Sequence, residues 1–164
     1  MNREILFKAK RKDWRNLPEE EWWVEGYYVY CRKRHYILPV LNKTIGYDER
    51  EDEWIEIDSG TLCQSTGLKD KNGRKVWEND ILRGHKNNDD LARVAFGEFN
   101  VIDVDTLETV DRAVGWHTEV IETDALSECE PFCLPMPLAD FYIKRSEFEA
   151  FGNIFDNADL LEVK

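Results

Sequence analysis

The dipeptide Asn72-Gly73, inside the stretch "QSTGLKDKNGRKVWENDIL" (64–82), constrains the fold of this chain more than any other feature. Asn-Gly is the strongest short-range signal for a β-hairpin, because both residues tolerate the positive φ of a type I′ turn. A second tight turn is expected at 78–80, where the Asp80 carboxylate can accept backbone N–H bonds. The stretch therefore predicts two turns that join three short strands.

Strand-like segments recur along the rest of the chain. They are rich in β-branched and aromatic residues or alternate polar with apolar positions, and turn-forming residues separate them. The segments lie at 3–10, 22–41, 54–58, 93–105 and 112–123, with "CRKR" (31–34) as the tip of a hairpin in the second. About seven to nine short strands with little helix predict a mainly β fold, either a small barrel or a sandwich.

Two segments near the C-terminus carry weaker signals. Ser146 and Glu149 have the spacing of a helix capping box, although a strand at 149–155 is the alternative. Asn157 is expected to cap one helical turn over 158–162. The stretch 129–138 holds three prolines, which predicts an irregular or extended connection and no helix.

Two ligand-binding interpretations of residues 64–82 fail at particular positions. With Gly73 as the invariant glycine of a calcium loop, Leu68 and Asn79 take the first and last ligand positions, where carboxylates are needed. A phosphate loop needs more glycines and a Lys-Ser/Thr pair at the start of a helix. The hairpin is the interpretation that remains.

The charge of the chain disfavours general affinity for nucleic acid. The formal net charge is −12, and residues 87–164 hold five Lys/Arg against eighteen Asp/Glu. A local basic face is still available at the predicted hairpin, where the candidate nucleic-acid contacts are Lys69, Lys71, Arg74 and Lys75. Exposed hairpins also carry such residues for solubility alone. The aromatic and basic segment 22–36 has the composition of a single-strand stacking platform, but a role in core and edge is favoured.

Metal and acid–base sites receive little support. Cys31, His35, Cys129 and Cys133 supply the number and type of ligands for zinc. However, residues four apart in a strand lie ~13 Å apart, so the first pair needs a tight turn, and buried or idle reduced thiols are favoured. His117 lies in a strand pattern beside Trp116, which favours a structural role. No catalytic motif is present, and no cofactor is expected.

Several stretches resemble the YopX family, small proteins encoded by bacteriophages, prophages and related mobile elements. "ILFKAKR", "WVEGYYVY" and "FGNIFDNADLL" resemble the opening, following and closing segments of that family. Asn79 stands where glycine is usual, and Asn also tolerates positive φ. The family motif is matched at Gln64, Thr66, Gly67, Leu68, Asp70, Asn72, Gly73, Trp77, Glu78 and Asp80, and near the C-terminus at Gly152 and Asn153.

The resemblance implies a mostly β fold with an SH3-like barrel. We expect a single domain over 1–164, with an N-terminal β segment at 1–60 and the barrel portion at 61–164. The resemblance implies no reaction and no catalytic residue. The absence of an apolar run of ~20 residues and of a signal peptide predicts a cytoplasmic protein without a membrane segment.

The leading functional hypothesis is a non-catalytic accessory protein of a phage or prophage that binds a protein partner, from the phage or the host, or itself as a homo-oligomer. The first alternative is binding of nucleic acid through the basic hairpin at 69–75. The second alternative is an acidic decoy that occupies a host DNA-binding protein.

Overall fold

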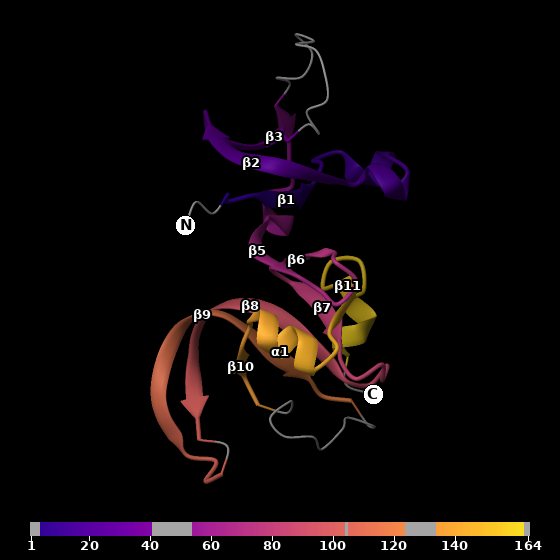
Figure 1. Ribbon diagram of the computed structural model, residues 1–164. Helices are drawn as coiled ribbons and strands as arrows, with labels where there is room; N and C mark the ends of the chain where they lie inside the picture. The colour runs from indigo at the N-terminus through magenta and orange to yellow at the C-terminus, as the bar shows by residue number, and fades with distance from the viewer. Residues whose placement is uncertain (1–3, 41–53, 104, 124–133, 163–164) are drawn as a thin grey trace. The chain divides into compact units, whose positions relative to one another are not determined.

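The computed structural model describes residues 4–40, 54–103, 105–123 and 134–162. Its strands form two antiparallel sheets, with the strand orders β4-β3-β2-β1-β5-β6 and β10-β9-β8-β7-β11 (Figure 1). The strands are β1 (Phe7–Lys10), β2 (Trp23–Cys31), β3 (Arg34–Pro39), β4 (Ile55–Glu56), β5 (Cys63–Lys69), β6 (Lys75–Trp77), β7 (Asp80–Arg83), β8 (Leu91–Ile102), β9 (Thr109–Ile121), β10 (Met136–Pro137) and β11 (Glu149–Asn153).

The mainly β prediction is confirmed, but the SH3-like barrel is not. Neither sheet closes into a barrel among the described strands, because each ends in two edge strands. Those edges are β4 and β6 in the first sheet and β10 and β11 in the second. No described helix is long and apolar enough to cross a membrane.

Helical structure in the described residues is short. The α-helix α1 (Asp140–Arg145) buries Tyr142 and Ile143 and carries two basic residues in its last turn, which favours its negative C-terminal end. No pattern in the sequence predicts this helix. The 3₁₀ helices are η1 (Trp14–Asn16), η2 (Glu19–Glu21), η3 (Ser59–Thr61) and η4 (Ala158–Leu161).

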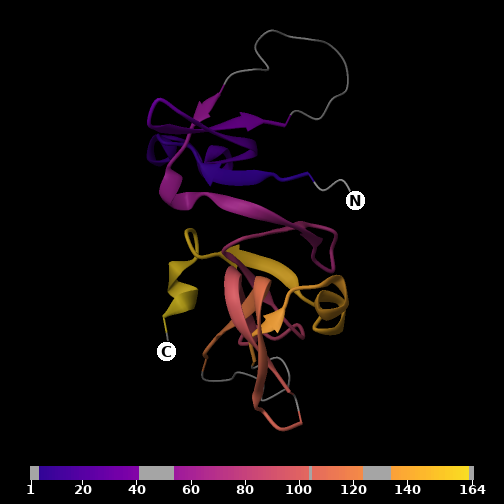
Figure 2. The same cartoon turned by 90° about the vertical axis from the view of Figure 1, so that its left-hand side faces the viewer.

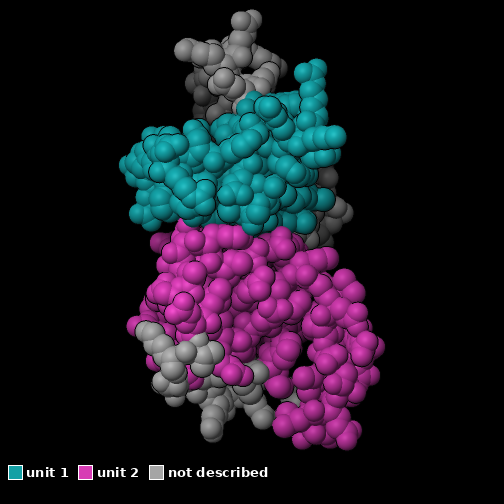
Figure 3. Space-filling model, turned by 180° about the vertical axis from the view of Figure 1, so that it is seen from behind, with its two compact units in different colours: residues 1–65 teal, residues 66–164 magenta. Residues whose placement is uncertain are grey.

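The chain divides into two units, Met1–Ser65 and Thr66–Lys164, shown in teal and magenta in Figure 3. Strand β5 belongs to both, since its first residues pair with β1 and the strand continues past Ser65. The single domain expected over 1–164 stays a prediction.

The core of unit 1 lies on one face of its sheet. Ala9, Val24, Ile37 and Ile57 are buried there. This follows from the register, because Ala9 pairs with Val24 and side chains directly opposite one another share a face. The predicted "CRKR" hairpin tip is confirmed, with β2 and β3 joined by a turn at 32–33.

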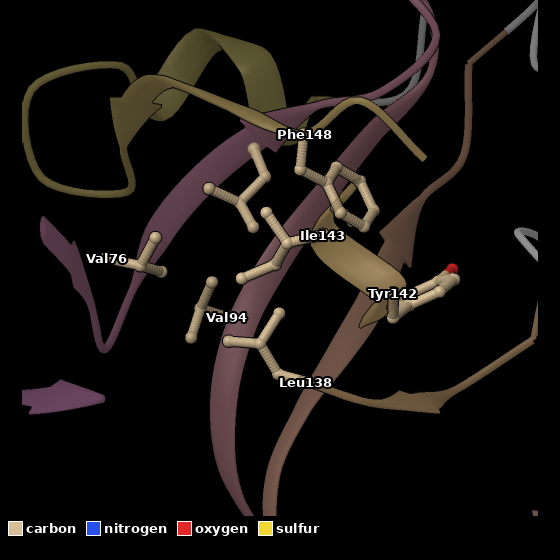
Figure 4. Close-up of a cluster of buried hydrophobic side chains, with 8 residues drawn as sticks. Val76, Val94, Leu138, Tyr142, Ile143 and Phe148 are labelled. Atoms are coloured by element: carbon tan, nitrogen blue, oxygen red, sulfur yellow. The ribbon is translucent and has the colours of Figure 1, made fainter. Parts of the chain in front are cut away.

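The core of unit 2 forms where α1 packs on the second sheet. Figure 4 shows Ile143 directed at side chains from β6 and β8, among them Val76 and Val94, while the Phe148 ring lies on the side of Tyr142, with ring centroids 5.3 Å apart. Phe148, Val76 and Val94 have no exposed surface. Leu138, which precedes the helix, completes the cluster.

The β8–β9 hairpin is much longer than the strands beside it. Figure 2 shows the two strands running side by side well beyond the rest of the sheet. Neighbouring strands pair only near its base, β7 with Leu91–Arg93 of β8 and β10 with His117 and Thr118 of β9. We call residues 97–102 and 109–115 the distal ribbon.

Two helix caps were predicted near the C-terminus, and neither forms as predicted. Ser146 caps the C-terminal end of α1 and Glu149 begins β11, so the capping box is wrong and the strand alternative is correct. Asn157 does precede a helical turn, η4, but its side chain makes no cap bond to that turn. The side-chain Oδ1 of Asn157 accepts instead from the backbone N–H of Asn153 at 3.1 Å.

Candidate functional site

The Asp70 carboxylate organises the hairpin between β5 and β6. Its Oδ1 accepts backbone N–H bonds from Asn72 (2.8 Å) and Arg74 (2.9 Å), and the residue is only 6% exposed. The backbone N–H of Gly73 donates to the Asp70 carbonyl, and that of Asp70 donates to the Arg74 carbonyl. These bonds close a loop of three residues.

The predicted type I′ turn is wrong in detail. Of the Asn72-Gly73 pair only Gly73 has positive φ, +79°. A three-residue loop that ends in one left-handed residue is the next most common hairpin, and Gly is the residue that it requires there. The extra carboxylate acceptor of Asp70 favours this longer loop over the two-residue turn.

The second predicted turn is confirmed at 78–79. Asn79 has φ of 64°, and the Oδ2 of Asp80 accepts the backbone N–H of Trp77 at 2.8 Å. Asn79 adds a contact that glycine lacks, because its side-chain oxygen accepts from Arg93 Nη2 at 2.7 Å. The turn leads the chain from β6 of one sheet into β7 of the other.

Four further motif residues lie in β5 and β11. Thr66 donates its hydroxyl to the Val76 carbonyl at 2.7 Å, and Gly67 has positive φ. Gly152 lies so close to Asn157 that an added Cβ would meet its Oδ1 at 2.2 Å. The Asn153 side-chain oxygen accepts backbone N–H bonds from Phe155 (2.9 Å) and Asp156 (3.0 Å).

Glu149 connects β11 to the hairpin and to β7. Arg83 donates from Nε at 2.8 Å and from Nη2, Asn72 donates from Nδ2 at 3.2 Å, and Lys71 Nζ lies 3.4 Å away. The hydrogen bonds from Arg83, followed by those from Asn72 and Lys71, hold the pKa of this carboxyl below its usual value. Glu149 is therefore a charged anchor of the scaffold.

The distal ribbon combines unpaired strand edges with exposed apolar side chains. No other described strand pairs with it, so backbone groups on its outer edges face no third strand. Exposed apolar side chains lie on it and at its base, with Phe96 56%, Val110 62% and Val114 72% exposed. Phe96 lies directly opposite Trp116, with ring centroids 4.9 Å apart.

A hollow of about 420 Å³ lies beside the ribbon, with His117 in its wall. His117 is 5% exposed and stacks on Phe99, with ring centroids 4.8 Å apart, and its Nδ1 lies 3.1 Å from the Gly115 carbonyl oxygen. Glu119 lies 3.6 Å from its Nε2. The packing of the ring against Phe99 fits the structural role expected from sequence.

A family model described as YopX protein matches residues 16–162 of the chain. The chain belongs to the YopX family. No curated protein matches it. Within the YopX motif, the Asp70 and Asp80 carboxylates accept backbone N–H bonds at two turns, and Asp70 also bonds to β11.

The four basic residues predicted to contact nucleic acid at the hairpin differ in their neighbours. Lys71 is paired with Glu149, and the Lys75 ammonium lies 5.7 Å from the centre of the Trp77 ring. Lys69 and Arg74 are exposed. Nucleic-acid binding by this YopX hairpin stays a prediction.

The structure describes two of the four predicted zinc ligands, Cys31 and His35. Cys129 and Cys133 lie outside the described residues. Across the β2–β3 hairpin Cys31 pairs with Arg34 and Tyr30 pairs with His35, so Cys31 and His35 lie on opposite faces. The described residues contain no group of three or more His, Cys, Asp or Glu arranged to hold a metal. Cys63 is a fully buried thiol in the described part of the chain.

Proposed function

We propose that this YopX chain is a non-catalytic binding module of a bacteriophage or prophage and that it contacts a protein partner through the distal ribbon. Family membership supports the origin in a mobile element. The observation that carries the binding role is the pair of strand edges that no other described strand covers. Such edges accept a strand from another chain through backbone hydrogen bonds.

Exposed apolar side chains supply the affinity that backbone pairing alone lacks. Val110 and Val114 are 62% and 72% exposed, although valine is among the residues most often buried. Full burial of such a side chain contributes about 1.5–3 kcal/mol. A partner that covers both, together with Phe96 at the base, gains enough for a specific contact.

The charge of the distal ribbon and its connecting loop selects the chemistry of the partner. Residues 97–115 carry five carboxylates and one guanidinium, and that guanidinium, Arg112, lies 3.1 Å from Glu98. We therefore propose a partner with a basic surface beside an apolar patch, since complementary charge steers association. The nucleic-acid-binding face of a host protein has this chemistry, in agreement with the decoy hypothesis.

The test begins with capture of partners from host cells by the tagged full chain. The doubly substituted V110D/V114D chain is compared with F141D, since Phe141 is 74% exposed on α1 of the same unit. We expect an identified protein with a basic surface that binds the wild-type and F141D chains and not the ribbon variant. Binding between the two purified proteins should weaken as salt rises.

Two outcomes would overturn this proposal. One is a partner that the ribbon variant still binds as tightly as the wild-type chain. The other is self-association, seen by analytical ultracentrifugation, that the ribbon substitutions abolish, because the ribbon would then serve a second copy of the chain.

A further inference from the structure

The outer face of the unit 1 sheet carries aromatic side chains on β2, on β3 and just before β4. The β2–β3 register puts Tyr27 opposite Leu38 and Val29 opposite Tyr36. These pairs face away from the core, because the alternate residues Tyr28 and Ile37 pack in it. Trp54, just before β4, extends the row, with its ring centroid 5.7 Å from that of Tyr36. We call Tyr27, Val29, Tyr36, Leu38 and Trp54 the aromatic face.

The aromatic face is accessible. Tyr27 is 43% exposed and Trp54 46% exposed, and Tyr36 is half-buried. The Tyr27 hydroxyl donates to Glu4, so this ring is fixed in place. Rings that are both held and exposed are suited to stacking with flat ligands, since little conformational entropy remains to be lost.

Positive side chains gather at one end of this face. Arg34 lies two residues before Tyr36, on the same face of β3. Lys12 donates a hydrogen bond to Glu56 of β4. Arg34 Nη1 lies 3.7 Å from the Glu56 carboxylate, while the side chains of Lys12 and Arg34 are 63% and 62% exposed. Lys12, Lys33 and Arg34 line a hollow of about 290 Å³, together with His35, Glu56, Ile57, Asp58 and Ser59.

Glu56 orients these cations. The hydrogen bond from Lys12, with further attraction from Lys12 and Arg34, lowers the pKa of its carboxyl. One charged carboxylate thus holds two long side chains in place at the sheet edge. Four basic residues (Lys12, Arg32, Lys33 and Arg34) surround this hollow or adjoin it, so positive charge exceeds that of Glu56 and Asp58.

The turn beside the hollow is built from residues that fit it poorly. Arg32 and Lys33 have φ of 50° and 63°, in the left-handed region that Asn and Gly favour. Both side chains are exposed at the tip of the β2–β3 hairpin. Here the turn projects two cations next to Arg34.

We propose that the aromatic face and the adjoining cations bind single-stranded nucleic acid. Unpaired bases stack on Tyr36 and Trp54, with Tyr27 extending the platform, and phosphates contact Lys33 and Arg34. A duplex offers its bases only at the groove edges, so stacking selects single strands. This site lies within unit 1 and does not depend on the proposed role of the ribbon.

Fluorescence anisotropy with labelled oligo-dT and oligo-U tests the proposal on the full chain at low salt. We expect both to bind, a matched duplex to bind much more weakly, and Trp54→Ala to weaken binding about tenfold through loss of one stacked base. K33Q/R34Q should weaken binding and flatten its salt dependence by about 0.7 per lost phosphate contact. Circular dichroism confirms that each variant is folded.

Matched control variants test whether binding takes place at the aromatic face. Phe141→Ala removes a ring from unit 2 that is more exposed than Trp54, and K69Q/R74Q removes two exposed cations from the β5–β6 hairpin; neither should change the affinity. The proposal is overturned if the wild-type chain gives no anisotropy change at low salt or if the duplex binds equally well. It is also overturned if the hairpin variant loses binding while the unit 1 variants retain it.

Discussion

The Asp70 carboxylate accepts the backbone N–H of Ala150 at 2.9 Å, which ties the β5–β6 hairpin to a strand 80 positions later in the chain. Its other oxygen closes the hairpin loop through Asn72 and Arg74. One side chain therefore sets both a local turn and the position of β11. This double role explains why an aspartate stands at the start of the Asn-Gly turn.

We predict that Asp70→Ala lowers the free energy of unfolding by about 3 kcal/mol, because three backbone donors lose a charged acceptor in a buried setting. Asp70→Asn keeps one oxygen and should cost less. Chemical denaturation measures both. Asp103 is a matched control, since it also accepts two backbone N–H bonds, from Asp105 and Thr106, but in an exposed turn. An equal loss for Asp103→Ala would contradict the role of burial.

Sequence alone could predict the parts of the fold that local patterns determine. Alternation predicted β8 and β9, and turn chemistry predicted Asn79 and the Asp80 acceptor, because these signals act within a few residues. It could not predict α1, since six residues carry too little periodicity for a helix and its stability comes from packing of Tyr142 and Ile143.

The candidate surfaces were harder to predict for a similar reason. Composition indicated aromatic and basic residues at 22–36, but only the strand register shows which of them share a face with Trp54, eighteen positions after Tyr36. The motif drew attention first, yet its Asp70 and Asp80 carboxylates bond to backbone N–H groups of the chain itself. The length of the distal ribbon past β7 and β10 also depends on pairing that no single segment encodes.

Glu149 should make stability depend on pH. Hydrogen bonds from Arg83, Asn72 and Lys71 lower its pKa in the folded state, so the unfolded state binds more protons near pH 4. The stabilisation is fully present above the unfolded pKa of about 4.3 and is lost as pH falls through the folded value. Denaturation of wild-type and Glu149→Gln chains from pH 7 to pH 3 should show a stability difference that shrinks with acidity.

Glu147 provides the control for that titration. It lies two residues earlier, is 48% exposed in its side chain and pairs only loosely with Lys86, at 3.5 Å. Glu147→Gln removes a half-exposed carboxylate and should change the free energy of unfolding by less than about 0.5 kcal/mol. A Glu149→Gln difference that stays constant down to pH 3 would contradict the assigned role of the ionised carboxylate.

Gly26 and Gly115 both lie in strands, but only Gly26 has neighbours that leave no space for a side chain. An added Cβ at Gly26 would lie 1.9 Å from the Leu38 carbonyl oxygen, whereas at Gly115 it would meet nothing within 4 Å. Because backbone atoms must move, Gly26→Ala should cost about 3 kcal/mol. Gly115→Ala should be neutral within about 0.5 kcal/mol. Thermal unfolding of the two variants compares them, and equal midpoints would contradict the contact.

Lys10 is 2% exposed in unit 1, and its ammonium lies 3.9 Å from the ring centre of Trp14 and 4.4 Å from that of Trp22. A desolvated cation–π contact contributes about 2 kcal/mol, and two rings share this ammonium. We therefore predict that Lys10→Met, which keeps most of the apolar stem, lowers the free energy of unfolding by about 2 kcal/mol. Denaturation followed by tryptophan fluorescence measures the loss, with Trp14 and Trp22 among the six tryptophans that contribute to the signal.

Lys12→Met is the matched comparison, because Lys12 lies two residues further on and is 63% exposed. Its pair with Glu56 is exposed to solvent, so its loss should change stability by less than about 1 kcal/mol. If Lys10→Met is as stable as the wild-type chain or more stable, the cost of burying the ammonium exceeds its attraction to the rings. Trp14 and Trp22 would then contribute to the stability of unit 1 through apolar packing and not through the ammonium.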